Sequence, residues 1–456
     1  MQEQLAGPTR RQAITGTAGA LGLLAATGSA ASAAKSGAAV PVGAHPATAA
    51  LQWIATVYDL VRQENLTPPA AARVYAHSAI AMYEATVAGM PGRVSLGGQL
   101  NALPRLPVAV HLGQLDWPTA LTAAVSTVLE GLLPFVATGT RPLLAATYDA
   151  QVAARRAAGV RERSITLSLA HGRAVGNALA RWSSTDGHAG TVGRAYVPPT
   201  GSDHLWVSTP PNFRPAIEPY WSQVRPMVMT RADEVEPAPA LPFSPDPASP
   251  FGQQAMTTYR QFFANTDEDR AIARFWTDNP GSFTPPLGVA TGLPAGHWML
   301  IGAQVLTQQG ARLDLTVETL ARTGIALHEA FLNCWTWKYR LNLLRPITYV
   351  NRYIDPTWNT FINTPQFPEY TSGHSVASPA AALVLADLLG DVPFTDHSHA
   401  ARGYPARTFT SFSHAAAEAA QSRLYGGIHY PMGIEAGLAQ GASVASLVLA
   451  RVRTRR

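Results

Sequence analysis

The chain has 456 residues, of which 47% are hydrophobic and 14% are charged. This balance excludes a chain that is mostly disordered, and it allows a large core, either in two or three domains or in two packed bundles of one body. The 34 lysines and arginines exceed the 29 acidic residues only slightly. The basic residues form no run of five or six, so a surface of mixed sign is favoured over a nucleic-acid face.

The N-terminal segment has the pattern of an export signal. Arg10 and Arg11 precede an apolar stretch of small residues that runs to Ala26, and residues 31–33 read "ASA", a suitable cleavage site. The arginine pair resembles a twin-arginine signal. The apolar run is too short and too rich in glycine and alanine for a membrane anchor. We therefore expect residues 1–33 to be removed and the protein to be exported by the twin-arginine route, without stable membrane insertion.

Helical spacing of apolar residues dominates the chain after this signal. The pattern predicts helices at 51–63, 68–89, 118–133, 142–159 and 163–184, and strand signals are scarce. Prolines crowd residues 191–252, which predicts a long irregular connection whose aromatic residues pack on the rest of the protein. Helices resume at residue 253. We predict an all-α fold with two helical bundles, 48–190 and 253–456, joined by the proline-rich connection 191–252 in one compact body.

Cys334 is the single cysteine of the chain. An exported protein with one cysteine has no internal disulfide, so its stability must come from a packed core. Because Cys334 lies in an apolar and aromatic stretch, we expect a buried packing residue and not a nucleophile.

Lys338 is one of only two lysines, the other being Lys35 beside the signal. The helix that carries Lys338 is predicted to end near Leu344, because Pro346 disfavours helical geometry at Arg345. Lys338 and Arg345 would then share one face of a helix and form an anion site. An exposed basic stripe is the alternative, and the aromatic residues around Lys338 argue against it.

Two further segments place polar side chains at helix ends. Ser372 is a good N-cap for a helix that begins with Gly373 and His374, and the free N–H groups of such an N-terminus attract anions. Downstream, Gly426 and Gly427 are expected to stop the helix of Arg423, and His429 follows just before Pro431, which starts another helix. Each segment alone is an ordinary helix end.

In order, the three segments read K-x6-R-P, S-G-H and S-R-x5-H. This order resembles the signature of the vanadium-dependent haloperoxidases and of the acid phosphatases that share their site, and residues 68–87 resemble the N-terminal helices of the bacterial haloperoxidases. The resemblance implies one vanadate per chain, with His429 as the metal ligand. It also implies that Lys338, Arg345 and Arg423 neutralise the oxyanion, that Ser372 and the Gly373 N–H group donate hydrogen bonds to it, and that His374 is the catalytic acid–base beside Lys338.

The implied reaction is the oxidation of chloride or bromide by hydrogen peroxide to a hypohalous-acid-like species, which halogenates a small organic acceptor. The metal would act as a Lewis acid without an electron-transfer partner. Trp335 and Phe367 occupy positions where fungal chloroperoxidases have aromatic residues beside the halide path. The compact ammonium of Lys338 would direct its charge at one oxygen, whereas the arginine fork prefers two. No nucleic-acid partner is expected, and a homodimer is left open.

Two positions depart from the family pattern. Thr371 stands in place of the usual proline, and Gly433 stands in place of an aspartate four residues after His429. Such an acid orients a metal-binding histidine, and Glu435 is the expected substitute.

Other functions remain open at this stage. In a phosphomonoesterase, His429 would attack phosphorus and His374 would protonate the leaving group. A non-catalytic oxyanion-binding protein is a third reading. A zinc hydrolase built on Asp396, His397 and His399 is disfavoured, because "DHSHAARG" is predicted to be a surface loop.

Overall fold

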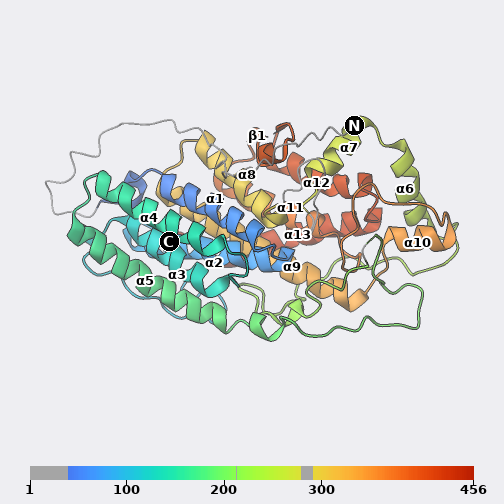
Figure 1. Ribbon diagram of the computed structural model, residues 1–456, viewed down its shortest axis with the longest axis horizontal. Coiled ribbons are helices and arrows are strands. Elements are labelled where there is room, and N and C mark those ends of the chain that lie inside the picture. Colours follow the sequence, from blue (N-terminus) through green and yellow to red (C-terminus); the bar gives the residue numbers. More distant parts are fainter. Residues whose placement is uncertain (1–39, 212, 279–290) are drawn as a thin grey trace, which may run out of the picture. The chain divides into compact units, whose positions relative to one another are not determined.

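The computed structural model describes residues 40–211, 213–278 and 291–456, and these residues belong to one compact unit. The predicted export signal at residues 1–33 lies outside them. Helices form nearly all the regular structure of the described residues, which confirms the all-α prediction (Figure 1). The exception is a two-stranded antiparallel sheet of β1 (Phe394–Asp396) and β2 (Arg407–Phe409). The division into two bundles at residues 48–190 and 253–456 stays a prediction.

The five helices predicted before the proline-rich connection are all present. They are α1 (Thr48–Gln63), α2 (Pro68–Thr86), α3 (Trp117–Leu132), α4 (Thr140–Ala157) and α5 (Glu162–Ser184). Pro68 and Pro69 stand at the first two positions of α2, where the missing N–H groups cost no helical hydrogen bond. All but one of the residues of α2 are buried, because α3 and α9 pack against it.

The second group of helices contains α9, the longest of the described helices. The members are α6 (Pro250–Ala264), α7 (Asp267–Phe275), α8 (Leu293–Gln308), α9 (Leu313–Leu341), α10 (Pro346–Tyr353), α11 (Gly373–Leu389), α12 (Phe412–Tyr425) and α13 (Pro431–Arg451). Helix α9 packs against α2 on one side and against α8, α11 and α13 on others. Every residue of α9 from Thr316 to Lys338 is therefore buried.

The end of α9 differs from the prediction. The helix stops at Leu341, because Asn342 takes a left-handed conformation with φ of 47°. Asparagine tolerates this conformation better than most residues. Arg345 is the extended N-cap residue of α10, so it does not share a helix face with Lys338. A tight turn, and not helical spacing, brings the two cations together.

The connection between α5 and α6 is irregular, as predicted. Its regular pieces are the short 3₁₀ helices η5 (His188–Gly190) and η6 (Trp221–Gln223). Trp206 and Trp221 are fully buried, and the Ile217 carbonyl accepts hydrogen bonds from Trp335 Nε1 at 3.2 Å and from the Tyr339 hydroxyl at 2.5 Å. The connection is thus held against the C-terminal part of α9, which carries Lys338.

Four other short 3₁₀ helices complete the described secondary structure: η2 (Val42–Ala44), η3 (Val87–Gly89), η4 (Leu112–Gln114) and η7 (Ala400–Arg402). Among the described helices, α13 alone is long and apolar enough to cross a membrane by length and composition. Half of its most apolar stretch is buried inside the protein, where it packs against α11, as a core helix does.

Candidate active site

The three sequence segments meet around one small, largely buried pocket. Its wall contains aromatic side chains, the N-terminus of α11 and both predicted histidines, and it is lined by Pro68, Asp278, Pro294, Phe331, Trp335, Pro365, Phe367, Gly373, His374, Ile428 and His429. Pro68 begins α2, so the N-terminal helices also contribute to the pocket.

Arg345 is the N-cap residue of α10, is fully buried and contacts three residues of the pocket wall. Its Nε donates to the Phe367 carbonyl at 2.8 Å and its Nη1 donates to the Ile428 carbonyl at 2.9 Å. The same Nη1 lies 3.1 Å from Nε2 of His429. Its Nη2 has no hydrogen-bond partner among the described residues.

Arg423, in the last turn of α12, has a similar arrangement. Its Nε donates to the Ser422 hydroxyl at 2.8 Å and its Nη2 donates to the Trp276 carbonyl at 2.6 Å. Within the described part of the chain, its Nη1 and the Nε2 atom of His374 are also buried without a partner. Buried donors normally have acceptors, so Nη1 of Arg423 and Nη2 of Arg345 suit an oxyanion that accepts from more than one direction.

Ser372 caps α11, as predicted, and accepts hydrogen bonds from the backbone N–H and the hydroxyl of Ser375. Because its oxygen serves as an acceptor, its own O–H can donate elsewhere. The N–H groups of Gly373 and His374 belong to the first turn of this 17-residue helix, where no helical carbonyl is available to them. These groups add donors and partial positive charge to the pocket.

His429 is held in the tautomer that a metal ligand requires. Its Nδ1 lies 2.7 Å from Oε1 of Glu369. A carboxylate oxygen accepts a hydrogen bond, so Nδ1 is the nitrogen that donates. Its Nε2 faces the Arg345 guanidinium, which can only donate. Nδ1 therefore carries the hydrogen and Nε2 carries a lone pair. Burial, Arg345 and Lys338 lower the pKa of His429 well below its usual value, which keeps the ring neutral.

Glu369 fills the role that the sequence analysis assigned to Glu435. Glu435 is exposed on α13, so that prediction is corrected. A Cβ atom at Gly433 would lie 2.5 Å from Glu369 Oε1, which means that the absent side chain at 433 leaves the space that this carboxylate occupies. Burial raises the pKa of Glu369 to about 7, against the opposing effects of Arg345 and Lys338.

Lys338 is fully buried and uses all three ammonium protons on one loop. Its Nζ donates to the carbonyls of Pro368 and Glu369, each at 3.0 Å, and of Thr371 at 2.5 Å. An ammonium has three donors at tetrahedral angles, and a planar guanidinium cannot reproduce this arrangement. Lys338 therefore fixes the loop before Ser372, in addition to contributing charge. Burial and the neighbouring Arg345 lower its pKa to about 8.

Phe367 and Trp335 form the aromatic side of the site. Their ring centroids lie 4.7 Å apart. The Phe367 ring also lies 5.1 Å from Lys338 Nζ and 4.9 Å from Arg345 Cζ. Two cations on one ring gain cation–π stabilisation, and the apolar wall reduces water access.

Comparisons with known proteins agree with this arrangement. A family model described as "VCPO second helical-bundle domain" matches residues 318–456. No curated protein matches the chain by sequence. Among solved structures, the first bacterial vanadium-dependent iodoperoxidase is 31% identical, with a TM-score of 0.83, over 90% of this chain and 97% of the other.

The chain belongs to the vanadium-dependent haloperoxidase family.

Two forms of a bacterial vanadium-dependent chloroperoxidase share the fold at 14% identity, each with a TM-score of 0.59 and 85% coverage of this chain. The holo form is covered over 92% of its length and the apo form over 96%.

The predicted residues of this haloperoxidase fit vanadate. The unpaired guanidinium and helix N–H donors suit its oxygens, and the lone pair of His429 Nε2 suits the metal. Arg345, Lys338, Arg423 and His374 are all near enough to His429 to lower its pKa electrostatically. The residues predicted from the three segments thus come together, and Glu435 is the exception. The expected role of Lys338 is also corrected, because its three ammonium protons contact backbone carbonyls and none is left to donate to an oxygen of the anion.

Two residues of the haloperoxidase, Asp278 and His297, were missed because they carry no motif, and Asp396 was assigned to a surface loop. Asp278 follows α7 and lines the pocket, His297 lies in α8, and Asp396 ends β1. Asp396 and His399 are fully buried, which corrects the prediction of a surface loop, although His397 is exposed. His297 supplies the buried partner that Asp396 requires, and this partner lies about a hundred residues away in the sequence.

Cys334 is buried, and burial raises the pKa of its thiol. The prediction of a packing residue is therefore confirmed, since a reactive cysteine needs the opposite shift.

Proposed function

We propose that the haloperoxidase binds vanadate between Arg345, Arg423, Ser372, Gly373 and His429, with His429 Nε2 as the metal ligand. The observation that carries this assignment is the meeting of unpaired, buried donors with a histidine nitrogen whose lone pair is fixed by Glu369. Bound vanadate would supply a Lewis acid that polarises hydrogen peroxide for attack by halide.

His374 is suited to accept a proton. Burial and the charge of Arg423 lower its pKa well below the usual value for histidine, so its ring is neutral at pH 7. Its unpaired Nε2 can take a proton from hydrogen peroxide that enters the pocket and return it later. Lys338 and the two arginines keep the pocket positive while this proton moves.

We infer that iodide is oxidised most readily. The similar protein is described as an iodoperoxidase, and iodide gives up electrons more easily than bromide or chloride. Phe331, Trp335 and Phe367 offer a polarisable wall for a large halide. Because the sequence resemblance implies chloride or bromide, the assay must compare the rates with iodide, bromide and chloride.

The organic acceptor is proposed to be a small molecule that reacts with the oxidised halide. Export rests on the N-terminal sequence pattern alone, with Arg10 and Arg11 as its main feature, and we retain it as a proposal.

The test is a halide-dependent assay of hydrogen peroxide consumption with the purified protein, with and without vanadate. A phosphomonoesterase assay is run in parallel. The proposal predicts activity that needs both vanadate and halide and that disappears in His429→Ala. Strong phosphatase activity, with no vanadate-dependent halide oxidation, would favour the alternative in which His429 attacks phosphorus.

A further inference from the structure

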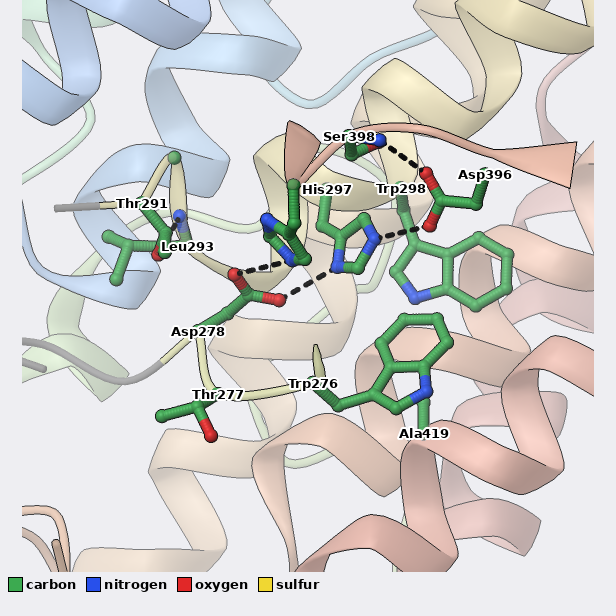
Figure 2. A network of polar contacts seen from close by, with 12 residues as sticks. Trp276, Thr277, Asp278, Thr291, Leu293, His297, Trp298, Asp396, Ser398 and Ala419 are labelled. Carbon is green, nitrogen blue, oxygen red and sulfur yellow. Dashed lines mark hydrogen bonds and ion pairs between the residues drawn. The ribbon is translucent and has the colours of Figure 1, made fainter. Parts of the chain in front are cut away.

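A buried imidazole outside the vanadate ligands is held between two carboxylates. Figure 2 shows His297 with Asp278 on one side and Asp396 on the other. Nδ1 of His297 lies 2.8 Å from Asp278 Oδ2, and Nε2 lies 2.6 Å from Asp396 Oδ2. Each of the three side chains is at most 1% exposed.

The hydrogen bonds of Asp278, His297 and Asp396 define the charge of the His297 ring. Oδ1 of Asp396 accepts from the Ser398 backbone N–H at 2.8 Å and from Gln304 Nε2 at 3.3 Å. Asp396 is therefore an acceptor on both oxygens. With ionised carboxylates on both sides, both nitrogens of His297 must donate, and this requires the imidazolium form.

Asp278, at the other end, is part of the oxyanion pocket wall together with His374 and His429. Two residues earlier, the Trp276 carbonyl accepts from Arg423 Nη2 at 2.6 Å and makes a backbone hydrogen bond with His374. The segment from 276 to 278 therefore touches both the charge-neutralising arginine and the acid–base histidine.

An ionised carboxylate in this wall creates an electrostatic problem. It would repel an oxyanion in the pocket, because like charges in a buried site are screened little by water. A cation paired with Asp278 on the side away from the pocket would offset this repulsion. His297 is suited to this role, because it contacts Asp278 Oδ2 and is not among the residues that line the pocket.

We propose that His297 and Asp396 form a positioning pair, in which Asp396 holds the imidazolium of His297 against Asp278 so that the Asp278 carboxylate stays fixed and paired with a cation beside bound oxyanion. This inference rests on the proposed vanadate site and adds residues from α8 and β1 to it. His297 and Asp396 act through Asp278 and do not touch the oxyanion.

The same cluster could be read as a metal site, because ligand atoms of Asp278, His297 and His399 lie within 4.8 Å of one another. Nδ1 of His297 is at hydrogen-bonding distance from Asp278 and carries a proton, so it has no lone pair for a metal. Because His297 is shared between the two carboxylates, Asp396 also has a cationic partner without an ion. The hydrogen-bonded pair is therefore favoured, and a bound cation becomes an outcome of the test.

The experiment measures the vanadate dissociation constant of the full chain by calorimetry, without hydrogen peroxide, for His297→Gln and Asp396→Asn. Asp396→Asn is nearly isosteric and lets His297 become neutral while its contact with Asp278 remains. Both variants should bind vanadate about tenfold more weakly than the wild type. His297→Gln/Asp278→Asn removes the carboxylate that needs neutralising and should return to within about threefold of the wild type.

The matched control is His328→Gln. His328 is also a buried histidine, and burial lowers its pKa to about 4, so it is neutral. It lies ten residues before Lys338 on α9, about 15 Å along the helix axis. This variant loses a buried imidazole of similar size and should bind vanadate as the wild type does. Thermal unfolding of every variant shows which of them fold. If His297→Gln does not fold, the vanadate affinity of Asp396→Asn decides the test.

Three results would overturn the inference. The first is vanadate affinity that is unchanged in both single variants. The second is a double variant that binds as weakly as His297→Gln, which would indicate loss of packing only. The third is one divalent metal ion in the purified protein that is lost in His399→Ala. A wild type that binds no vanadate at all would instead count against the proposed function.

Discussion

The carboxylate of Glu369 occupies the space that a side chain at Gly433 would need. A Cβ atom at Gly433 would lie 2.5 Å from Oε1 and 2.8 Å from Oε2 of Glu369, distances that side chains do not adopt. The acid that orients His429 therefore comes from the loop before α11 and not from α13. The same Oε1 also accepts from the Tyr430 N–H group at 2.9 Å, which fixes its position.

Glu369→Gln should weaken vanadate binding by about 10–100-fold, because loss of an acid behind a histidine ligand has this effect on metal affinity. Glutamine keeps the shape and can still accept from Nδ1, but it cannot make Nε2 more basic. The vanadate dissociation constant, measured by calorimetry, checks this prediction.

Moving the acid from position 369 to position 433 provides the control. Glu369→Ala/Gly433→Asp should bind vanadate at least about tenfold more tightly than Glu369→Ala, since the new aspartate enters the space left by Glu369. If the exchanged variant binds no better than Glu369→Ala, the carboxylate does not act through His429.

Lys338→Arg should destabilise the protein, although it retains the charge. The guanidinium cannot donate to Pro368, Glu369 and Thr371 together, and the loss of one or two charged hydrogen bonds costs about 2–4 kcal/mol. The loop that carries Ser372 and Gly373 should shift, so kcat should fall as well. Chemical denaturation and peroxidase rates measure the two effects.

Lys338→Met is the comparison for charge alone. It should weaken vanadate binding more than Lys338→Arg does, because it removes a cation from the pocket. A Lys338→Arg protein with the stability and kcat of the wild type would contradict the role assigned to the three carbonyl contacts.

The three sequence segments predicted the residues of the oxyanion pocket, because the residues within each segment are close together in the sequence and each segment lies at a helix end. The acid behind His429 could not be predicted this way, since its choice depends on the space beside Gly433 in the folded protein. Arg345 was placed on the wrong helix because nothing in the spacing indicates that Asn342 takes a left-handed conformation. Asp396 and His399 looked like surface residues because their partner, His297, is distant in the sequence.

The stability of the protein should depend on pH through His297. Burial alone would lower its pKa, but Asp396 and Asp278 raise it from 6.5 to about 10. The folded protein therefore binds this proton more tightly than the unfolded chain. The stabilisation is fully present below about pH 6.5 and is lost as the pH rises through about 10.

His297→Gln should remove this dependence, so its stability should differ most from that of the wild type near pH 6 and least near pH 10.5. Denaturant unfolding across this range measures the difference. A constant difference at all pH values would mean that His297 is not protonated in the folded protein.

Phosphate should compete with vanadate, because both are tetrahedral oxyanions that accept from the same arginine and helix N–H donors. Saturating phosphate should raise the apparent vanadate dissociation constant in proportion to its concentration. Arg423→Ala, which removes an unpaired donor, should weaken the binding of both anions. Vanadate binding that is indifferent to phosphate would show that the two anions occupy different sites.

A crystal structure of the protein soaked in vanadate would show directly which atoms hold the metal. We predict one vanadium per chain, joined to Nε2 of His429, with its oxygens near Arg345, Arg423 and the N-terminus of α11. Full-occupancy vanadium bound elsewhere, for example at Asp278, His297 and His399, or an empty pocket in a soaked crystal of active enzyme, would contradict the account.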